Sequence, residues 1–221
     1  MARKPNPQKD RGSIAIIVDG KDEKWYIEKV RQNYRCGKLR TISIKPELPT
    51  KKSVQEQFDF AKQKINEGSS FVILILDLDN MIKEKKEGPR GVQKFNKFKD
   101  LYFNYIKIKK GEQLRGYEWM KNLLVIVNNP CLEYWFLLHY KQTDKFYDDF
   151  ETSLRKELIK ISELSEYSKD EPFYNNPPDI YKRLESKLAD ARRNAKQFVL
   201  GECENKGCSE MNLIFDYFDT L

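Results

Sequence analysis

Three continuous apolar runs constrain the fold of this 221-residue chain more than any other feature of its sequence. They lie at residues 14–18, 71–76 and 123–127, and an acidic or amide residue follows each of them. Runs without polar interruption are typical of parallel strands that are buried on both faces. Segments with helical spacing of apolar residues separate the runs, so we expect an α/β fold with a mostly parallel sheet flanked by helices.

Periodicity and helix-breaking residues predict the other elements. A β-branched stretch predicts a short strand at residues 41–44, ended by the prolines that follow it. Ser53 is expected to cap one helix, and Asn129 is expected to cap another that begins at Pro130. Helices are expected at residues 22–34, 53–67, 92–105, 130–140, 146–167, 179–198 and 211–221, with a loop at 83–91 and a turn-rich break at 171–179.

The predicted elements divide the chain into an arm, a domain and an extension. Residues 1–12 are polar, contain two prolines and are expected to form a flexible arm. Residues 13–140 are expected to form the α/β domain, and residues 141–221 a helical extension packed on it. No apolar run approaches the roughly 20 residues of a membrane span, and no apolar signal segment is visible. We therefore expect a cytoplasmic protein without membrane contacts.

Polar residues follow the apolar runs where the strands are expected to end. Asp19 follows the first run, Asp77 and Asp79 follow the second, and Asn128 and Asn129 follow the third. The carboxyl ends of parallel strands meet at one edge of a sheet, and open α/β folds bind their ligands there. We therefore expect these side chains to gather at one edge.

Carboxylates at such an edge suit a hard divalent cation. Mg²⁺ prefers oxygen ligands and is often held by a few carboxylates together with substrate phosphates. Residues i and i+2 of an extended segment point the same way, so Asp77 and Asp79 can reach one ion. With Asp19 they form the predicted site for Mg²⁺ or Mn²⁺, and Glu23, one helical turn after Asp19, would support catalysis. A strand-ending Asp can instead cap a helix or a turn, and this alternative stays open.

Two further residues lie in the helix expected at residues 130–140. Glu133 is in its first turn and points toward the same edge of the sheet, where it could act as a further ligand or as a base. The alternative is that Glu133 completes a helix cap. His139 is the only histidine of the chain, which excludes a metal site built from several histidines. We expect it to pack in the core.

The net charge of +7 comes from one stretch of the chain. Residues 83–121 carry 12 Lys or Arg against 5 Asp or Glu, whereas the rest of the chain has 29 of each. Such a cluster can neutralise the phosphates of a nucleic acid, although an anionic nucleotide or simple solubility are alternatives. The aromatic residues within it have the spacing of one helical face and are expected to point into the core. The candidate nucleic-acid-binding residues are Lys94, Lys97, Lys99, Lys107, Lys109, Lys110 and Arg115.

Two sequence blocks resemble a known family. IAIIVDGKDE at residues 14–23, followed by VILILDLDN at 72–80, looks like a Toprim domain, which has a Rossmann-like fold. In that domain an apolar strand ends in an acidic residue and Gly, another acidic residue follows, and a later strand ends in Asp-x-Asp. NNPCLEYWFLLHY at residues 128–140 is similar to the Pro-x-x-Glu-x-Trp-x-x-x-His block of RloB-like (AbiLii-type) proteins, which are Toprim-related phage-defence proteins.

The resemblance implies a metal-dependent nuclease, acting on DNA or RNA, of a bacterial antiphage system of the abortive-infection type. Asp19, Gly20, Glu23, Asp77 and Asp79 fill the Toprim positions, and Asp19 stands where the family normally has Glu. Because Asp is one methylene shorter, the alternative is a catalytically degenerate nucleic-acid-binding or sensor module. A nuclease that aborts infection must be kept silent, so a regulatory protein partner, a homo-oligomer or a ligand activator is expected.

Other enzyme classes fit the sequence less well. The segment 77–80 is similar to the nucleophile motif of haloacid-dehalogenase-like phosphatases, but that motif usually ends the first strand and continues with Thr or Val. The sequence has no glycine-rich phosphate loop and no nucleophile elbow of a serine hydrolase. Cys203 and Cys208 lack a second ligand pair, so zinc is not expected.

Overall fold

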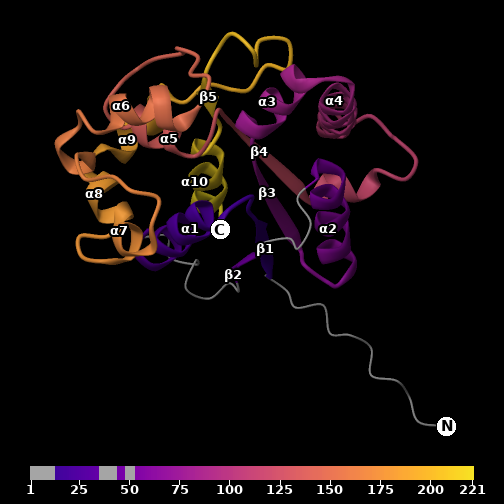
Figure 1. Ribbon diagram of the computed structural model, residues 1–221. Coiled ribbons are helices and arrows are strands. Elements are labelled where there is room, and N and C mark those ends of the chain that lie inside the picture. The colour runs from indigo at the N-terminus through magenta and orange to yellow at the C-terminus, as the bar shows by residue number, and fades with distance from the viewer. Residues whose placement is uncertain (1–12, 35–43, 48–52) are drawn as a thin grey trace.

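In the part of the chain that the structure describes, a five-stranded sheet in the order β2-β1-β3-β4-β5 forms the centre of the fold (Figure 1). The computed structural model describes residues 13–34, 44–47 and 53–221. Strands β2, β1, β3 and β4 run parallel to one another, and β5 is antiparallel to β4. The predicted α/β fold with a mostly parallel sheet is confirmed. The strands are β1 (Ile14–Ile17), β2 (Ile44–Glu47), β3 (Phe71–Asp77), β4 (Leu123–Asn129) and β5 (Cys208–Ser209).

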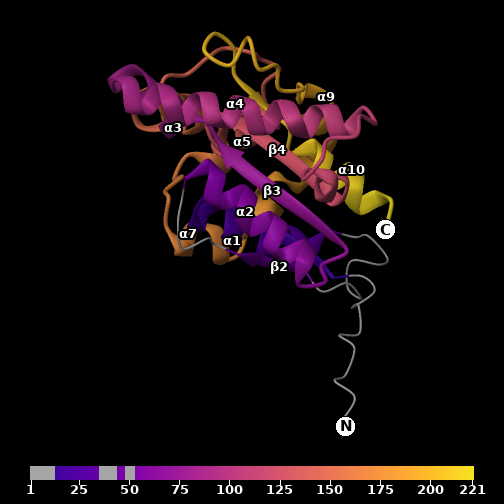
Figure 2. The ribbon, with the colours of Figure 1, turned by 90° about the vertical axis from the view of Figure 1, so that its right-hand side faces the viewer.

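Helices cover both faces of the sheet. Figures 1 and 2 show α2, α3 and α4 on one face, with α4 running as a long rod above β3 and β4. The other face is covered by α1, α5 and the helices of the C-terminal part of the chain. The helices are α1 (Lys21–Asn33), α2 (Val54–Asn66), α3 (Asp79–Glu87), α4 (Pro89–Lys109), α5 (Glu133–Leu138), α6 (Arg155–Leu158), α7 (Glu171–Asn175), α8 (Ile180–Leu184), α9 (Leu188–Asn194) and α10 (Asn212–Asp219).

The alternation of side chains along the strands divides the hydrophobic core into two halves. Ile16 and Ile73 point to the half that contains α1, α5 and α10, whereas Ile17 and Leu74 point to the half beneath α2 and α4. Because both halves are filled, residues on both faces of the central strands are buried. This explains why the strands appear in the sequence as uninterrupted apolar runs.

The helix at residues 53–67 follows its sequence signals closely. Ser53 accepts a hydrogen bond from the backbone N–H of Glu56, and the Glu56 side chain accepts one from the backbone of Ser53. This capping box starts α2 where the sequence predicted. The aromatic face expected on the basic helix is also confirmed, since Phe95, Phe98 and Tyr102 of α4 are buried.

The prediction of a loop at residues 83–91 is wrong, because this charged segment is helical on both sides of Gly88. It forms the end of α3 and the first turn of α4. Gly88 has φ 145°, a conformation that side chains rarely allow, and Pro89 opens α4 at a position where no backbone donor is needed. The lysines and glutamates of this segment therefore lie on two helices that turn back on each other.

The predicted start of the helix after β4 is also wrong. Asn129 does not cap this helix, because β4 continues through Asn129, which pairs with Cys208 of β5. The Asn129 side chain donates to the carbonyl oxygens of Cys203 and Lys206 at 2.6 and 2.7 Å. Helix α5 begins only at Glu133.

Two long helices were predicted after residue 141, and the structure has a series of short ones. Asp149, Asp170 and Asp179 each accept a hydrogen bond from the backbone N–H three residues further on, and each begins a new helical turn. One of these, α7, lies inside the segment predicted as a turn-rich break. Buried tyrosines and phenylalanines of these turns pack against α1 and α5. The C-terminal helix is confirmed as α10.

The second strand extends further along the chain than predicted. Its described part covers Ile44–Glu47 and includes Pro46, which was expected to break it. Strand β2 stands at the end of the sheet, where a proline costs no ladder hydrogen bond on the outer side. The arm predicted at residues 1–12 and the first part of the predicted strand lie outside the described residues. In the described part of the chain, no helix combines the length and the apolarity that crossing a bilayer requires.

Glu210 joins the C-terminal part of the chain to the sheet. Its side chain is buried and accepts hydrogen bonds from the backbone N–H groups of Val127 in β4 and Phe198 at 3.1 and 3.0 Å. Burial raises the pKa of Glu210 from 4.5 to about 7, although both hydrogen bonds lower it. The residues before and after β5 thus share one buried carboxyl group with the central sheet.

This buried carboxyl group predicts a pH dependence of stability. Between about pH 4.5 and 7 the folded chain keeps the Glu210 proton and the unfolded chain releases it, so the free energy of unfolding decreases as pH rises. We expect Glu210→Gln to flatten this decrease, as measured by urea unfolding at pH 4.5 to 7. The exposed Glu112→Gln is the control, and an equal slope in wild type and Glu210→Gln would contradict the assignment.

Candidate active site at the carboxyl edge of the sheet

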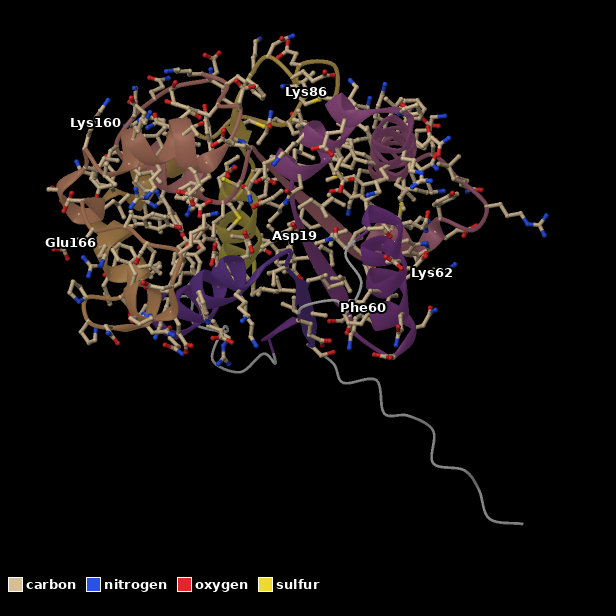
Figure 3. The ribbon with its side chains drawn as sticks, in the orientation of Figure 1. Asp19, Phe60, Lys62, Lys86, Lys160 and Glu166 are labelled. Carbon is tan, nitrogen blue, oxygen red and sulfur yellow. The ribbon has the colours of Figure 1, made fainter. Side chains whose placement is uncertain are left out.

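The acidic residues predicted to meet do so at the carboxyl ends of β1 and β3. Asp19 follows β1, Asp77 ends β3, and Asp79 begins α3. Figure 3 shows Asp19 near the middle of the molecule, whereas Lys86, Lys160 and other charged side chains point outward from its rim. The parallel arrangement of β1, β3 and β4 brings these ends together, as the sequence analysis expected.

Asp77 is held by groups from two other elements. Its Oδ1 accepts a hydrogen bond from Nδ2 of Asn128 at 3.0 Å, and its Oδ2 accepts one from the backbone N–H of Leu132 at 3.2 Å. Asn128 in turn accepts a hydrogen bond from the hydroxyl of Ser209 at 2.6 Å. Burial, followed by the negative charges of Glu23 and its acidic neighbours, raises the pKa of Asp77 well above its usual range.

Glu23 lies buried beside Asp77, at the start of α1. A methyl group on Gly20 would lie 2.7 Å from Oε2 of Glu23, so the carboxyl group fits only because position 20 lacks a side chain. The same Oε2 is buried without a hydrogen-bond partner. Burial raises the pKa of Glu23 to about 7, with a further contribution from the charge of Glu133. Glu23 thus packs closely against Gly20 at the start of the helix.

The other two carboxylates of the predicted metal site, Asp19 and Asp79, also accept hydrogen bonds. Oδ1 of Asp19 accepts a hydrogen bond from Nε2 of Gln57 on α2 at 2.5 Å. Oδ1 of Asp79 accepts one from the backbone N–H of Asn80 at 2.6 Å. Burial raises the pKa of Asp79, and the hydrogen bond from Asn80 lowers it in part. Both side chains are half-buried and can be approached from solvent.

Glu133 lies behind this cluster and is not a helix cap. Its Oε1 accepts hydrogen bonds from the hydroxyl of Tyr167 at 2.6 Å and from Nζ of Lys169 at 2.8 Å, and its Oε2 is buried without a partner. Lys169 also lies 3.6 Å from Asp22 and above the ring of Phe150. Burial would lower the pKa of Lys169, but the charges of Glu133 and its neighbours raise it above its ordinary value.

The donors suit a hard divalent cation, but they do not converge in this structure. In the described residues, no group of three or more His, Cys, Asp or Glu side chains is arranged to hold a metal ion. Hydrogen bonds from Gln57, Asn80 and Asn128 engage the carboxylates instead. Mutual repulsion favours protonation of these carboxylates, and Oε2 of Glu23 beside them has no hydrogen-bond partner. Bound Mg²⁺ or Mn²⁺ would offset this repulsion and accept carboxylate oxygens as ligands.

A cleft of about 600 Å³ opens directly beside the carboxylates. Its lining includes Asp19 and Asp77 from the sheet edge and Lys94 and Lys97 from α4. Acidic residues from the sheet edge and basic residues from the predicted nucleic-acid-binding helix therefore face the same space. This juxtaposition depends on the α3–α4 turn, which brings the start of α4 back toward β3.

The candidate nucleic-acid-binding residues do not form one surface. Lys94 and Lys97 line the cleft, whereas Lys99 is near Cys203, on another side of α4. Nζ of Lys109 donates to the carbonyl oxygen of Lys121 at 3.1 Å. The remaining members, which belong to the far end of α4 or follow it, are Lys107, Lys110 and Arg115.

Several residues of the site were missed by the sequence analysis. Gln57 was not singled out because an amide on a helix has no local signal for a contact with Asp19. Lys169 lies in a turn 36 positions after Glu133, and only the packing of the C-terminal part brings the two together. His139 is confirmed as a core residue: it packs on Trp135, and burial lowers its pKa to about 4.

The fold and the site together define an α/β protein with a cluster of acidic side chains at the carboxyl edge of a mostly parallel sheet. The family model of RloB-like proteins matches residues 14–216, and the chain therefore belongs to the RloB-like family. The match continues beyond residue 140 through β5 and into α10. A comparison with curated proteins and one with solved structures gave no match.

The packing of Glu23 against Gly20 gives a direct test of the site. Gly20→Ala would push the Glu23 carboxyl group out of its buried position, while the backbone at position 20, at φ −136° and ψ −179°, accommodates alanine. We expect the pKa of Glu23 to fall from about 7 toward 4.5, as measured by NMR titration of labelled glutamate carboxyl groups. Glu23→Gln assigns the signal, and Glu210 should titrate unchanged. A Glu23 that keeps its raised pKa would refute this packing argument.

Proposed function

We propose that this protein is a metal-dependent nuclease with a Toprim-type active site. The observation that carries the proposal is the cleft of about 600 Å³ that joins Asp19 and Asp77 to Lys94 and Lys97. Carboxylates that can hold a divalent cation, placed beside lysines that can contact phosphates, are what phosphodiester hydrolysis requires. Membership of the RloB-like family supports the same assignment.

The proposed ligands of the cation are Asp77, Asp79 and Asp19, with Glu23 buried behind them. Bound Mg²⁺ or Mn²⁺ would supply Lewis-acid stabilisation of the charge that develops on the phosphoryl oxygens. Asp77 is fixed by Asn128 and by the N–H of Leu132, so its direction is set before any ligand binds. Asp79 is held differently, because it accepts its hydrogen bond from the N–H of Asn80 at the start of its own helix.

Asp19 has a second proposed role as general base. Its carboxylate lines the cleft and is oriented by the amide of Gln57. In hydrolysis, the oxygen of a water molecule attacks the phosphorus atom, its proton passes to a base such as Asp19, and the bond from phosphorus to the leaving oxygen breaks. Lys94 and Lys97 would hold the phosphate backbone near this point.

The biological setting of the proposal follows from the family. The resemblance to RloB-like proteins suggests a role in abortive infection, in which a nuclease acts on DNA or RNA of the infected cell. A charged group lies behind the carboxylates and consists of Lys169, Glu133 and Asp22. We include Glu133 in the proposed active site, because it adds a buried negative charge behind the proposed metal ligands.

A second candidate function is a nucleic-acid-binding or sensor module without cleavage. One observation favours it: no group of three His, Cys, Asp or Glu side chains is arranged to hold a metal ion within residues 13–34, 44–47 and 53–221. Asp19 in the position where Toprim domains normally have Glu points the same way. A binding module would keep the cleft and the lysines and would not respond to loss of the carboxylates.

Cleavage assays separate the two candidates. Wild-type protein with Mg²⁺ or Mn²⁺ is expected to cut at least one of three substrates: total tRNA, single-stranded DNA or plasmid DNA. EDTA should abolish the cuts. Asp77→Ala should lower the rate by about 100-fold or more, since loss of a residue outside the ligand shell of a metal site already costs about 10- to 100-fold. Asp100→Ala, an exposed carboxylate on α4, is the control. Full activity of Asp77→Ala would refute the assignment of the site.

Metal binding can be measured without any substrate. Mg²⁺ or Mn²⁺ should raise the melting temperature of the wild type, because a ligand of the folded state alone stabilises that state. The increase should be larger at pH 8 than at pH 6, since protons compete for the carboxylates, and it should be lost in the double variant Asp77→Asn/Asp79→Asn. Equal increases in this variant and in the wild type would show that the cation binds elsewhere.

A further inference from the structure

A second cavity adjoins the cleft beside the carboxylates. The second cavity, of about 520 Å³, lies over the α3–α4 turn and is lined by Gly88 and Arg90 among others. Two residues, Glu84 of α3 and Lys94 of α4, line both cavities. The two spaces therefore adjoin at this pair of residues, one beside the sheet edge and the other over the turn between the helices, and together we call them the groove.

An ion pair stands at the junction of the two cavities. Nζ of Lys94 lies 2.6 Å from Oε2 of Glu84, and both side chains are about half exposed, at 56% and 41%. The backbone holds this pair in place: a Cβ at Gly91 would lie 1.8 Å from the carbonyl oxygen of Glu84, so only glycine lets the two helices approach this closely. A ligand phosphate that reached Lys94 would have to compete with Glu84.

The size and lining of the cleft indicate what can enter it. A volume near 600 Å³ is that of a pocket for a single small-molecule ligand, which suits one extruded nucleotide and not a double helix. Amide side chains of Gln55, Gln93 and Asn80 face this space together with Val54 and Met81. Proteins recognise unstacked bases through hydrogen bonds to the base edge and through side chains that pack on the base face. Here the amides could form the hydrogen bonds and the apolar side chains could pack on the face.

We propose that the cleft binds an unpaired nucleotide of the nucleic acid and that the adjoining backbone crosses the α3–α4 turn, where a phosphate displaces Glu84 from Lys94. The identity of the ligand as a nucleic acid rests on the proposed function, but its unpaired state and its path rest on the groove. Glu84 is then a residue that weakens binding. Lys107 is 13 residues from Lys94 along α4, about 20 Å away, and lies off this path.

The test measures binding and not cleavage. A fluorescent single-stranded oligonucleotide of mixed sequence and its duplex are titrated in EDTA, so that neither metal nor turnover is needed. The single strand should bind more tightly than the duplex. Glu84→Gln should tighten single-strand binding about two- to fivefold, the range expected when an exposed ion pair no longer competes. Lys94→Gln should weaken binding and reduce the slope of log affinity against log salt by about one.

Matched variants separate this path from a general effect of charge. Glu112→Gln, just beyond the end of α4, and Lys62→Gln, on the exposed side of α2, change the net charge by the same amounts, and we expect neither to alter affinity. In the double variant Glu84→Gln/Lys94→Gln the gain from Glu84→Gln should disappear. Equal effects of Glu84→Gln and Glu112→Gln, or equal binding of duplex and single strand, would overturn the proposal. Because binding is measured without metal, an inactive nuclease site would leave these outcomes unchanged.

Discussion

The carboxylate of Asp77 is the point at which the separate parts of the molecule meet. It ends the central strand, accepts hydrogen bonds from Asn128 of β4 and from the start of α5, and through Asn128 is connected to Ser209 of β5. A hydrogen-bonded chain of this kind polarises its members and fixes their direction. The geometry of the acidic edge therefore depends on a strand that lies more than 130 residues further along the chain.

This arrangement is costly for the folded state. Burial and like charges raise the pKa values of Asp77, Glu23 and Asp79 together, which means that each charge is harder to hold in the fold than in water. A purely structural network would offset this cost with cations. Here neutral donors, Asn128 and the backbone N–H groups of Leu132 and Asn80, contact Asp77 and Asp79. The charge of Lys169 offsets that of Glu133 and lowers the pKa of Asp79 in part, but burial still raises it. Several carboxyl groups with raised pKa values in one cluster are typical of functional sites.

Most of the sheet could be predicted from the sequence, because strands buried on both faces leave continuous apolar runs. The helix at Ser53 could be predicted because its capping box is local. The α3–α4 turn could not be predicted, because its many charged residues indicate a loop. Only the packing of Gly91 against α3 shows that the chain is helical on both sides of the turn. The short C-terminal helices were missed because capping aspartates and buried aromatic contacts interrupt a helical periodicity that the sequence shows as continuous.

The same division holds for the site. Asp19 and Asp77 could be predicted because strand ends follow from topology alone. Gln57 and Lys169 could not, because their positions depend on the packing of helices and turns that are distant in sequence. The basic stretch was predicted to bind phosphates as a cluster in the sequence, but a long helix separates its charges in space. A sequence count cannot show on which side of the helix each charge lies.

That separation decides which charges can act on a ligand at the acidic edge. The carboxylates repel a polyanion, so its approach requires positive charge close enough to offset them. At physiological salt the screening length is about 8 Å, so Lys107 and the residues beyond it, about 20 Å from Lys94, contribute little to the potential in the cleft. Lys94 and Lys97 stand at the cleft itself. The turn at Gly88 thus brings the lysines of α4 next to the carboxylates at the sheet edge. Without this turn, α4 would carry its lysines away from β3, and no positive charge of α4 would offset the repulsion between the carboxylates and an anionic ligand.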